Sequence, residues 1–592
     1  MKCFEYPLDT GYLLRKKRAI KRELRAQGTA NLHKKIAVLG GSTTNEVVDQ
    51  LEMFLLNYGI EAEFYQSEYN QYWQDAMFGS EELDAFSPDV IYIHTGFRNI
   101  TEFPTTASTK QEVEEMLQAQ YQHFEVMWEK LSEKFRCPII QNNFERPNYR
   151  LLGNKDISDY RGRTNFISRL NQKLYEYAQS HENFCVNDLD YLASDYGYAQ
   201  WQDGFYWHMY KYALCLDAIP YLAKSLADII KSLYGRNKKA FSLDLDNTLW
   251  GGVVGDDGVE GIAIGPEVSL GQVYEEFQNY LKAHKQIGVL LTVNSKNEME
   301  NAMAGLKHPD GPLKPEDFVA IKANWENKDR NLIETAAELS LGADSFVFVD
   351  DNPAERAIVE ANVPGVSVPV MERAEQYIRT LDHGGYFEVT TLSKDDLARN
   401  EMYKANAQRA VQMASFADYG EYLDSLEMQA TVRPFEPIYY PRISQLTNKS
   451  NQFNLTTRRC SEAEIQNMQE NPDWLCLYGK LADKFGDNGL VSVVAGEEQG
   501  SELHLRLWLM SCRVLKRGME DAMLDCLVSD AKAHGLTALI GYYYPTAKNG
   551  MVRDFYERMG FTRVSLAEDG SSVWRCEVAD YQPKHPHMTI TR

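Results

Sequence analysis

Short apolar runs alternate with longer amphipathic stretches over the first 230 residues of the chain. Between the runs lie segments whose apolar residues recur with helical spacing, for example from Glu112 to Phe135. The predicted strands are Lys35–Leu39, Val90–His94, Pro138–Gln141 and Phe184–Asn187. Strands that alternate with helices pack as a parallel sheet, so this region is predicted to be an α/β domain.

The same alternation returns after about residue 236. An amphipathic stretch at Val273–His284 lies among predicted strands at Ala240–Leu243, Val289–Asn294, Phe318–Ile321 and Ser345–Val349. A charged helix at Leu397–Arg409 then leads into a third region with strand patterns at Leu503–Leu509 and Ala538–Tyr544. We therefore expect an α/β protein of three domains, at residues 1–235, 236–400 and 401–592.

Residues 14–25 form a basic amphipathic segment in an acidic chain, whose formal net charge is −23. This segment either docks an acidic partner helix or packs on its own domain through Leu14, Ile20 and Leu24, and we favour the second interpretation. The acidic balance argues against a general nucleic-acid-binding function, because neutralising phosphates requires a basic surface.

Nine cysteines are scattered along the chain without a C-x-x-C pair, a pattern typical of a reducing compartment and of a protein without structural zinc. No apolar run approaches the roughly 18 residues of a membrane span, and the first residues lack the core of a signal peptide. We expect a cytoplasmic protein that does not bind membranes.

The strongest chemical signal follows the predicted strand Ala240–Leu243, which ends on a carboxylate. Asp244, Asp246 and Thr248 come next, at alternate positions. Polar residues also follow the later strands of this region: Asn294, Ser295, Asn297, Lys328, Asp350 and Asp351. Open α/β sheets bind ligands at the carboxyl ends of their strands, and paired carboxylates suit Mg²⁺. The alternative interpretation is an Asp-rich turn without catalytic function.

This ordered set of motifs resembles that of the haloacid dehalogenase (HAD) superfamily. The resemblance implies that Asp244 attacks phosphorus or binds Mg²⁺, and that Asp246 protonates the leaving oxygen and then activates the acceptor. The implied metal ligands are Asp244, Asp246, Asp350 and Asp351. The residues expected around the phosphoryl group and the rest of the substrate are Ser295, Lys328, Thr248, Asn294 and Asn297. No long insertion suits a large cap, so we expect a site open to a bulky substrate.

Three weaker motifs in the first region resemble the blocks of SGNH hydrolases, which have a flavodoxin-like sandwich fold. Ser42 follows a glycine turn, Asn99 ends a Gly-Phe-Arg-Asn segment, and Asp203 lies five residues before His208. The resemblance implies a second site at Ser42, Asn99, Asp203 and His208. The alternative interpretation is a degenerate scaffold in which Ser42 caps a helix.

The third region resembles a GNAT acyltransferase domain of α+β architecture. Its loop Arg513-x-x-Lys516-x-Gly518 resembles the loop with which such domains hold a pyrophosphate at a helix N-terminus. Tyr556 matches a frequent GNAT general acid, with core packing as the alternative. The resemblance implies that Arg513, Lys516, Gly518 and Tyr556 receive a pantetheine arm.

The order of the three regions, with the segments LDLDNTLWGG, FVDDNPAER and NQFNLTTRR, resembles the FkbH-like family of HAD subfamily IIIC. That resemblance implies a Mg²⁺-dependent enzyme that takes the glyceryl group of 1,3-bisphosphoglycerate, releases phosphate and loads an acyl carrier protein thiol. Relatives often carry a cysteine just before the motif-two serine, whereas this chain has Asn294, and an amide cannot form a thioester.

Three hypotheses follow from these motifs. The first is acyl transfer from an acyl phosphate to a carrier thiol. The second is hydrolysis of a small phosphorylated metabolite. The third is a non-catalytic scaffold that binds a carrier protein. The complete motif set argues against it, because a scaffold has no need of Asp246, Lys328 and Asp350 together.

Overall fold

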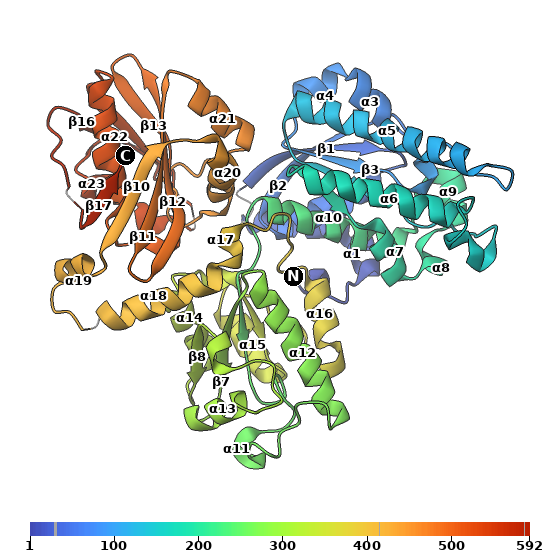
Figure 1. Ribbon diagram of the computed structural model, residues 1–592, viewed down its shortest axis with the longest axis horizontal. Coiled ribbons are helices and arrows are strands. Elements are labelled where there is room, and N and C mark those ends of the chain that lie inside the picture. The colour runs from blue at the N-terminus through green and yellow to red at the C-terminus, as the bar shows by residue number, and fades with distance from the viewer. Residues whose placement is uncertain (29–31, 414, 547, 585) are drawn as a thin grey trace. The chain divides into compact units, whose positions relative to one another are not determined.

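The computed structural model describes residues 1–28, 32–413, 415–546, 548–584 and 586–592, and only the backbone of residues 407, 410 and 411. The chain forms two compact units. The first is Met1–Arg236 with His383–Thr391, and the second is Asn237–Asp382 with Leu392–Arg592. The described residues build three sheets, of five, four and eight strands (Figure 1). These sheets confirm an α/β protein of three parts, while the domain boundaries at residues 235 and 400 stay predictions.

Five parallel strands in the order β2-β1-β3-β4-β5 form the sheet of the first unit. They are β1 Leu32–Gly40, β2 Ile60–Gln66, β3 Val90–His94, β4 Ile139–Asn142 and β5 Phe184–Asn187. The sequence pattern predicts all but β2, an edge strand in which polar residues interrupt the apolar ones. Strand order reverses between β1 and β3, and sheets of this kind bind ligands at such a reversal.

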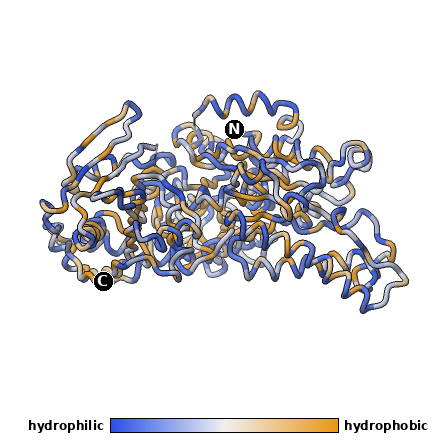
Figure 2. Tube along the Cα trace, turned by 90° about the horizontal axis from the view of Figure 1, so that it is seen from above, coloured by the Kyte–Doolittle hydropathy of each residue, from blue (hydrophilic) through white to orange (hydrophobic). Residues whose placement is uncertain are grey.

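Helices cover both faces of this sheet (Figure 1). One face packs against α1 Thr10–Ala26, α2 Asn45–Asn57 and α10 Ile219–Leu233, and the other against α5 Lys110–Phe135 and α6 Arg163–Ser180. Apolar stretches lie mainly inside the trace and hydrophilic ones mainly at its periphery (Figure 2). Two-sided burial explains why the strands are almost wholly apolar.

The basic helix α1 packs on its own unit, as favoured from the sequence. Its buried side chains are Leu13, Ile20 and Leu24, so Leu13 takes the place predicted for Leu14. Lys17 Nζ lies 2.7 Å from Asp49 Oδ2, and Lys21 Nζ lies 2.8 Å from Asp49 Oδ1. Asp49 belongs to α2, so the acidic partner of the basic helix is the neighbouring helix of the same unit.

The second unit begins with four parallel strands in the order β8-β7-β6-β9. They are β6 Ala240–Leu243, β7 Leu290–Ser295, β8 Ala320–Ala323 and β9 Phe346–Val349, flanked by helices that include α12 Ser269–Gln286 and α14 Lys328–Glu338. β8 begins two residues later than predicted, because the 3-10 helix Pro315–Asp317 precedes it and pairing with β7 starts at Ala320. The carboxyl ends of all four strands lie at one edge.

A mixed sheet of eight strands forms the C-terminal part, in the order β15-β16-β14-β13-β12-β11-β10-β17. Its strands are β10 Met428–Pro434, β11 Trp474–Asp483, β12 Gly486–Gln499, β13 Glu502–Met510, β14 Ala538–Tyr543, β15 Thr562–Leu566, β16 Ser572–Glu577 and β17 Met588–Thr591. The parallel strands β13 and β14 pair only from Glu502 to His504 and then separate.

Residues Phe453–Leu455, which we call the inserted segment, lie in the opening between β13 and β14. The Leu455 amide donates to the Trp508 carbonyl at 3.0 Å, and the Tyr544 amide donates to the Leu455 carbonyl at 2.9 Å. A third bond runs from the Met510 amide to the Phe453 carbonyl at 3.0 Å. The chain itself thus satisfies backbone groups that the separation of the strands would leave unpaired.

Two helices, α17 Lys394–Leu397 and α18 Arg399–Met413, connect the two parts of the second unit. The Arg399 guanidinium donates to the Gly288 carbonyl at 3.1 Å, and Asn400 Nδ2 donates to the Lys285 carbonyl at 2.9 Å. Arg409 forms a bidentate salt bridge with Asp483 of β11: Nε donates to Oδ2 at 2.8 Å, and Nη2 donates to Oδ1 at 2.6 Å. Among the described residues, no helix is long and apolar enough to cross a membrane.

Candidate functional site: an acidic cluster at the edge of the four-stranded sheet

Asp244 is the first residue after β6, which pairs with β7 on one side and with β9 on the other. Its amide donates to the Val349 carbonyl of β9 at 2.9 Å, which continues the β6–β9 pairing by one residue. The Thr248 hydroxyl accepts a hydrogen bond from the Asp351 amide at 3.2 Å, so the loops after β6 and β9 are tied together. These two bonds fix the carboxylates of both loops at the same edge.

Carboxylate oxygens of Asp244, Asp350 and Asp351 lie within 4.8 Å of one another. Asp244 and Asp350 are buried, and Asp351 is partly exposed. Burial, reinforced by the negative charge of Asp244, raises the pKa of Asp350 to about 6. Three hard oxygen donors that repel one another at a sheet edge fit a divalent cation such as Mg²⁺.

Lys328 is the first residue of α14, and its ammonium group lies between two members of this cluster. Lys328 Nζ is 2.9 Å from Asp244 Oδ1 and 2.6 Å from Asp350 Oδ2. Burial lowers the pKa of Lys328, but the charges of Asp244 and Asp350 outweigh burial and leave that pKa raised. One ammonium group against three carboxylates leaves the cluster short of positive charge.

Asp246 lies beside the cluster but outside the group of three. Its Oδ1 accepts from Trp250 Nε1 at 2.9 Å and from the Val254 amide at 3.0 Å, and its Oδ2 accepts from Asn297 Nδ2 at 3.0 Å. Burial nevertheless raises the pKa of Asp246. A carboxyl group that is oriented by three donors and protonated more easily than usual is suited to proton transfer.

The remaining residues predicted around the substrate lie at the same edge. Ser295 ends β7 and is buried. Asn294 Nδ2 donates to the Lys328 carbonyl at 2.8 Å, while Asn294 Oδ1 is buried and accepts no hydrogen bond from any described residue. The structure thus gives Asn294 a positioning contact with the first turn of α14. The catalytic and binding roles of these residues stay predictions.

Sequence reasoning missed two residues that shape this site. Trp250 fixes one oxygen of Asp246, as described above. The Arg356 guanidinium donates to the carbonyls of Asp350 and Asp351, at 2.8 and 2.7 Å, and so holds the loop after β9. Both residues lie close in sequence to a predicted carboxylate, which could have drawn attention to them. Trp250 follows Asp246 by four residues, and Arg356 follows Asp350 by six.

In the first unit, Ser42 and Asn99 lie at the carboxyl ends of β1 and β3. Asn99 Nδ2 donates to the Gly41 carbonyl at 3.0 Å, and Ser42 is buried with a hydroxyl that has no hydrogen-bond partner within the described ranges. Asp203 caps the helix α9 Gly204–Tyr210 by accepting from two of its amides, and His208 is exposed on that helix. Among the hydrogen bonds of the described residues, none joins Asp203, His208 and Ser42. A hydrolytic role for this site stays a prediction.

Two buried titratable residues at this edge were not singled out from the sequence. Glu145 accepts a hydrogen bond from the Phe97 amide at 3.1 Å, and burial raises the pKa of Glu145 to about 7. Burial also lowers the pKa of His94, the last residue of β3, to about 4. Apolar surroundings rather than a partner charge dominate both shifts.

In the C-terminal part, the loop Arg513–Gly518 leads into helix α22 Met519–Ala533, as predicted. Lys516 and Gly518 both have left-handed backbone, with φ of +63° and +77°. Tyr556 is buried, and its hydroxyl has no hydrogen-bond partner among the residues that the structure describes. Its ring fills the space above Gly541, where an added Cβ would lie 2.4 Å from it. The structure therefore gives Tyr556 a packing role, and a role as general acid stays a prediction.

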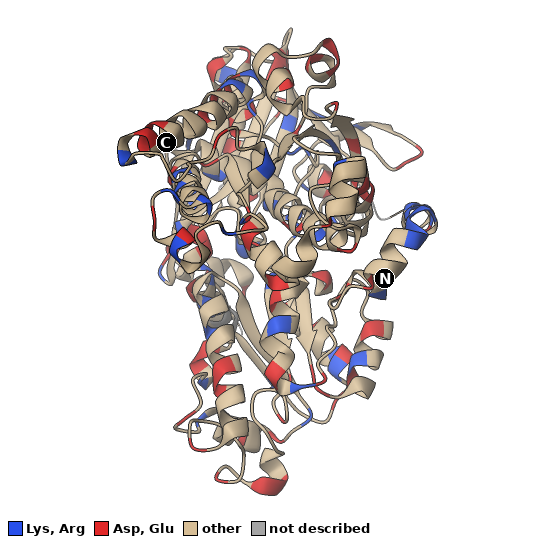
Figure 3. Ribbon diagram, turned by 90° about the vertical axis from the view of Figure 1, so that its right-hand side faces the viewer, with Lys and Arg blue, Asp and Glu red and all other residues tan. Residues whose placement is uncertain are grey.

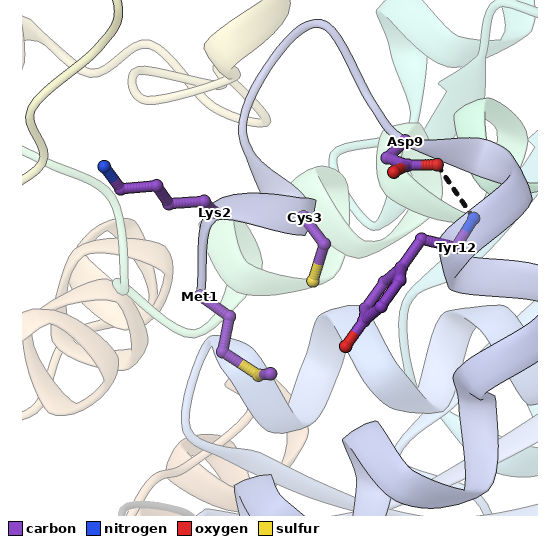
Figure 4. Close-up of a pocket in the computed structure, with 5 residues that line it drawn as sticks. All are labelled: Met1, Lys2, Cys3, Asp9 and Tyr12. Atoms are coloured by element: carbon purple, nitrogen blue, oxygen red, sulfur yellow. Dashed lines mark hydrogen bonds between the residues drawn. The ribbon is translucent and has the colours of Figure 1, made fainter.

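A separate hollow of about 390 Å³ lies near the N-terminus and is lined by Met1, Lys2, Cys3, Asp9 and Tyr12 (Figure 4). Asp9 caps α1 by accepting from the Tyr12 amide at 2.8 Å. Burial raises the pKa of Cys3, which makes its thiol less reactive. None of the residues predicted to be functional lines this hollow.

Comparison with known proteins gives three findings. Residues 35–231 match the family model "FkbH, N-terminal domain". The chain is similar to the N-terminal part of protein BF1531 from Bacteroides fragilis, described as containing a phosphatase domain complexed with Mg. The identity is 29% and the TM-score 0.59, over 63% of this chain and 99% of that one. No curated protein matches the chain.

Acetyltransferases match a smaller share of the chain. The ribosomal-protein-S18-alanine N-acetyltransferase of Escherichia coli is 14% identical, with a TM-score of 0.21, over 26% of this chain and 98% of that one. The GNAT domain of S. lividans PAT is 17% identical, with a TM-score of 0.21, over 25% of this chain and 89% of that one.

Proposed function

We propose, from the FkbH N-terminal domain at residues 35–231 and the acidic cluster that follows it in the chain, that this protein is a Mg²⁺-dependent enzyme acting on a phosphorylated small molecule. The observation that carries the proposal is Lys328, whose ammonium group lies between Asp244 and Asp350 and faces the same edge as Asp246. The similarity to a phosphatase-domain protein crystallised with Mg supports it.

When bound by Asp244, Asp350 and Asp351, Mg²⁺ would neutralise the repulsion between the carboxylates and an incoming phosphate. Lys328 supplies a fixed positive charge for phosphoryl oxygens as they gain charge. In hydrolysis, an Asp244 oxygen forms a bond to phosphorus while the bond to the leaving oxygen breaks. Asp246 gives its proton to that oxygen, and its raised pKa suits this step. Water then attacks phosphorus and gives a proton to Asp246 while the bond between Asp244 and phosphorus breaks, which releases phosphate and restores both carboxyl groups.

We further propose that the substrate is an acyl phosphate, such as 1,3-bisphosphoglycerate, and that its glyceryl group passes to the pantetheine thiol of an acyl carrier protein. In this reaction the thiol sulfur bonds to the acyl carbon, the carbon–oxygen bond breaks, and phosphate leaves. The thiol proton ends on the phosphate or on Asp246. Lys328 then stabilises the departing phosphate, and no acyl group is held on Asn294.

Exposed apolar side chains after three strands support a large second substrate. Val253 follows β6, Met299 follows β7 and Trp325 follows β8, with exposed fractions of 37%, 44% and 68%. Exposed apolar side chains mark a partner site where they form one contiguous patch, and the proposal is that these three form such a patch beside the acidic cluster. The alternative function, hydrolysis of a phosphate monoester, is favoured by the orientation and raised pKa of Asp246.

An isotope experiment separates the two functions. The protein is incubated in H₂¹⁸O with Mg²⁺, 1,3-bisphosphoglycerate and a phosphopantetheinylated carrier. The masses of the carrier and of the released phosphate are then measured by mass spectrometry. Acyl transfer predicts a carrier heavier by one glyceryl group and phosphate without ¹⁸O from water. Hydrolysis through Asp244 predicts ¹⁸O in the phosphate and an unchanged carrier. Activity that survives in Asp244→Asn and in Lys328→Met would refute both.

A further inference from the structure

Six charged side chains gather where the connecting helices α17 and α18 meet the C-terminal part, and we call this group the connector cluster. The helix α20 Tyr440–Lys449 contributes two of them. The cluster consists of the carboxylates Asp395 and Asp396 and the cations Arg399, Arg442, Lys449 and Arg513. The cluster therefore has an excess of two positive charges.

Close contacts hold the cluster together. Arg442 Nη2 lies 2.6 Å from Asp395 Oδ2, and Lys449 Nζ lies 3.3 Å from both oxygens of Asp396. Arg399 also pairs with Asp396, and Arg513 Nη2 is 3.9 Å from Asp395 Oδ2. Both carboxylates are thus shared between two cations each, and neither is left to balance the excess.

The surroundings of the cluster restrict water without excluding it. The side chain of Arg513 is 10% exposed and that of Arg442 is 15% exposed, while that of Lys449 is 33% exposed. Gly489 of β12 approaches so closely that an added Cβ would lie 3.1 Å from both carboxylate oxygens of Asp395. Arg442 Nε is buried and, among the described residues, has no hydrogen-bond partner.

An uncompensated positive charge in such a place is costly, because burial removes water without supplying a counter-charge. Burial, joined by Arg399 and Arg442 and opposed by Asp396, lowers the pKa of Lys449 to about 8. Burial likewise lowers the pKa of Arg442 to about 10. Burial is the main cause of both shifts, and neighbouring guanidinium groups add to it.

We propose that the connector cluster binds a phosphate group, either as inorganic phosphate or as part of a larger molecule. A phosphate dianion matches the excess of two charges, and its oxygens accept bonds from guanidinium groups better than a halide does. Arg442 Nε supplies a free donor, and Lys449 lies at the side open to solvent. Figure 3 shows that acidic and basic residues are interspersed along much of the ribbon in this view.

The site is independent of the acidic cluster at the sheet edge, because it shares no residue with it. Arg399 belongs to the connector cluster and also donates to the Gly288 carbonyl before β7. A bound phosphate would therefore also fix the helix that joins the two parts of the second unit.

Isothermal titration of the full chain with inorganic phosphate tests the proposal. EDTA is included so that the acidic cluster stays negative and repels phosphate, and sodium chloride at equal ionic strength is the blank. Wild-type protein is expected to bind one phosphate per chain. Arg442→Met is expected to weaken binding roughly tenfold or more, the loss typical of a hydrogen bond to a charged group.

Arg458→Met is the matched control, because Arg458 lies in the same part of the chain, is 38% exposed and faces Glu464. It is expected to bind phosphate as the wild type does. If Arg442→Met does not fold, Lys449→Gln replaces it with the same expected loss. Glycerol phosphate and pyrophosphate, titrated in parallel, distinguish a free phosphate from one carried on a larger molecule. No phosphate-specific heat, or equal affinity in Arg442→Met and wild type, would overturn the proposal.

Discussion

Replacing Lys328 with methionine removes the only ammonium group that contacts both Asp244 and Asp350 within the described acidic cluster. Methionine has nearly the same length, so the change removes charge rather than volume. Two buried carboxylates then lie close together without a counter-charge. Breaking a buried pair in this way costs about 3–5 kcal/mol of stability.

The pH dependence of this loss follows from Asp350. Its pKa is raised to about 6 in the folded protein, so the folded state binds its proton more tightly than the unfolded state. Such a carboxyl group destabilises the fold increasingly as the pH rises from about 4 to about 6. Without Lys328 the pKa of Asp350 rises further, because Lys328 is one of the groups that lower it. The variant should therefore lose most stability above pH 6 and approach the wild type near pH 5.

Hydrogen–deuterium exchange of peptides from β6 and α14 measures this local stability directly. Faster exchange at pH 7.5 is expected in Lys328→Met without metal, and added Mg²⁺ should restore part of the protection. Lys296→Met is the control, because Lys296 forms a partly exposed pair with Glu355, in which the two side chains are 34% and 13% exposed, and such a pair is worth less than about 1 kcal/mol. Equal exchange in Lys328→Met and wild type at pH 7.5, or a difference that does not change with pH, would refute this reasoning.

Three further outcomes are expected. Asn297→Ala removes one of three donors to Asp246, so phosphate release should slow roughly tenfold with little change in KM, and an unaltered kcat would contradict the role given to Asp246. Tyr556→Phe should leave activity and melting temperature nearly unchanged, because the buried hydroxyl has no hydrogen-bond partner in the described part of the chain, and a large loss of carrier loading would instead support the general-acid role. Chelation of divalent metal should abolish phosphate release, and Mg²⁺ should restore it in wild type but not in Asp244→Asn; release that persists in excess EDTA would argue against a metal-dependent site.

The acidic cluster could be predicted because its chemistry follows strand ends. Asp244 and Asp350 each come directly after an apolar run, and parallel strands bring such ends to one edge. Lys328 lies about 80 residues from Asp244 along the chain, and only the match to a family motif connected the two before the structure did.

Contacts made by irregular backbone could not be predicted. The sequence around Phe453–Leu455 is rich in amide and hydroxyl side chains, as loops often are, whereas the structure places this segment between β13 and β14 with backbone hydrogen bonds to β13 and to the residue after β14. Similarly, the choice between Leu13 and Leu14 on α1 depends on how the helix is rotated against α2, and the periodicity of the sequence tolerates either. Such features are decided by tertiary packing.

The return of the chain to the first unit at His383–Thr391 has a consequence for folding and for protein engineering. Buried Lys231 donates to the Gly385 carbonyl at 2.5 Å and pairs with Asp228 at 2.6 Å, and the Ser232 hydroxyl donates to the Glu388 carbonyl at 2.8 Å. Residues 237–382, which belong to the second unit together with residues 392–592, therefore separate the two segments of the first unit in the sequence. We call the first unit the host and residues 237–382 the guest. During synthesis the host completes its packing only after the guest has been made, and a fragment ending at residue 236 lacks nine residues that cover its last helix. Joining those nine residues to Arg236 through a short flexible linker would yield the complete host without its guest.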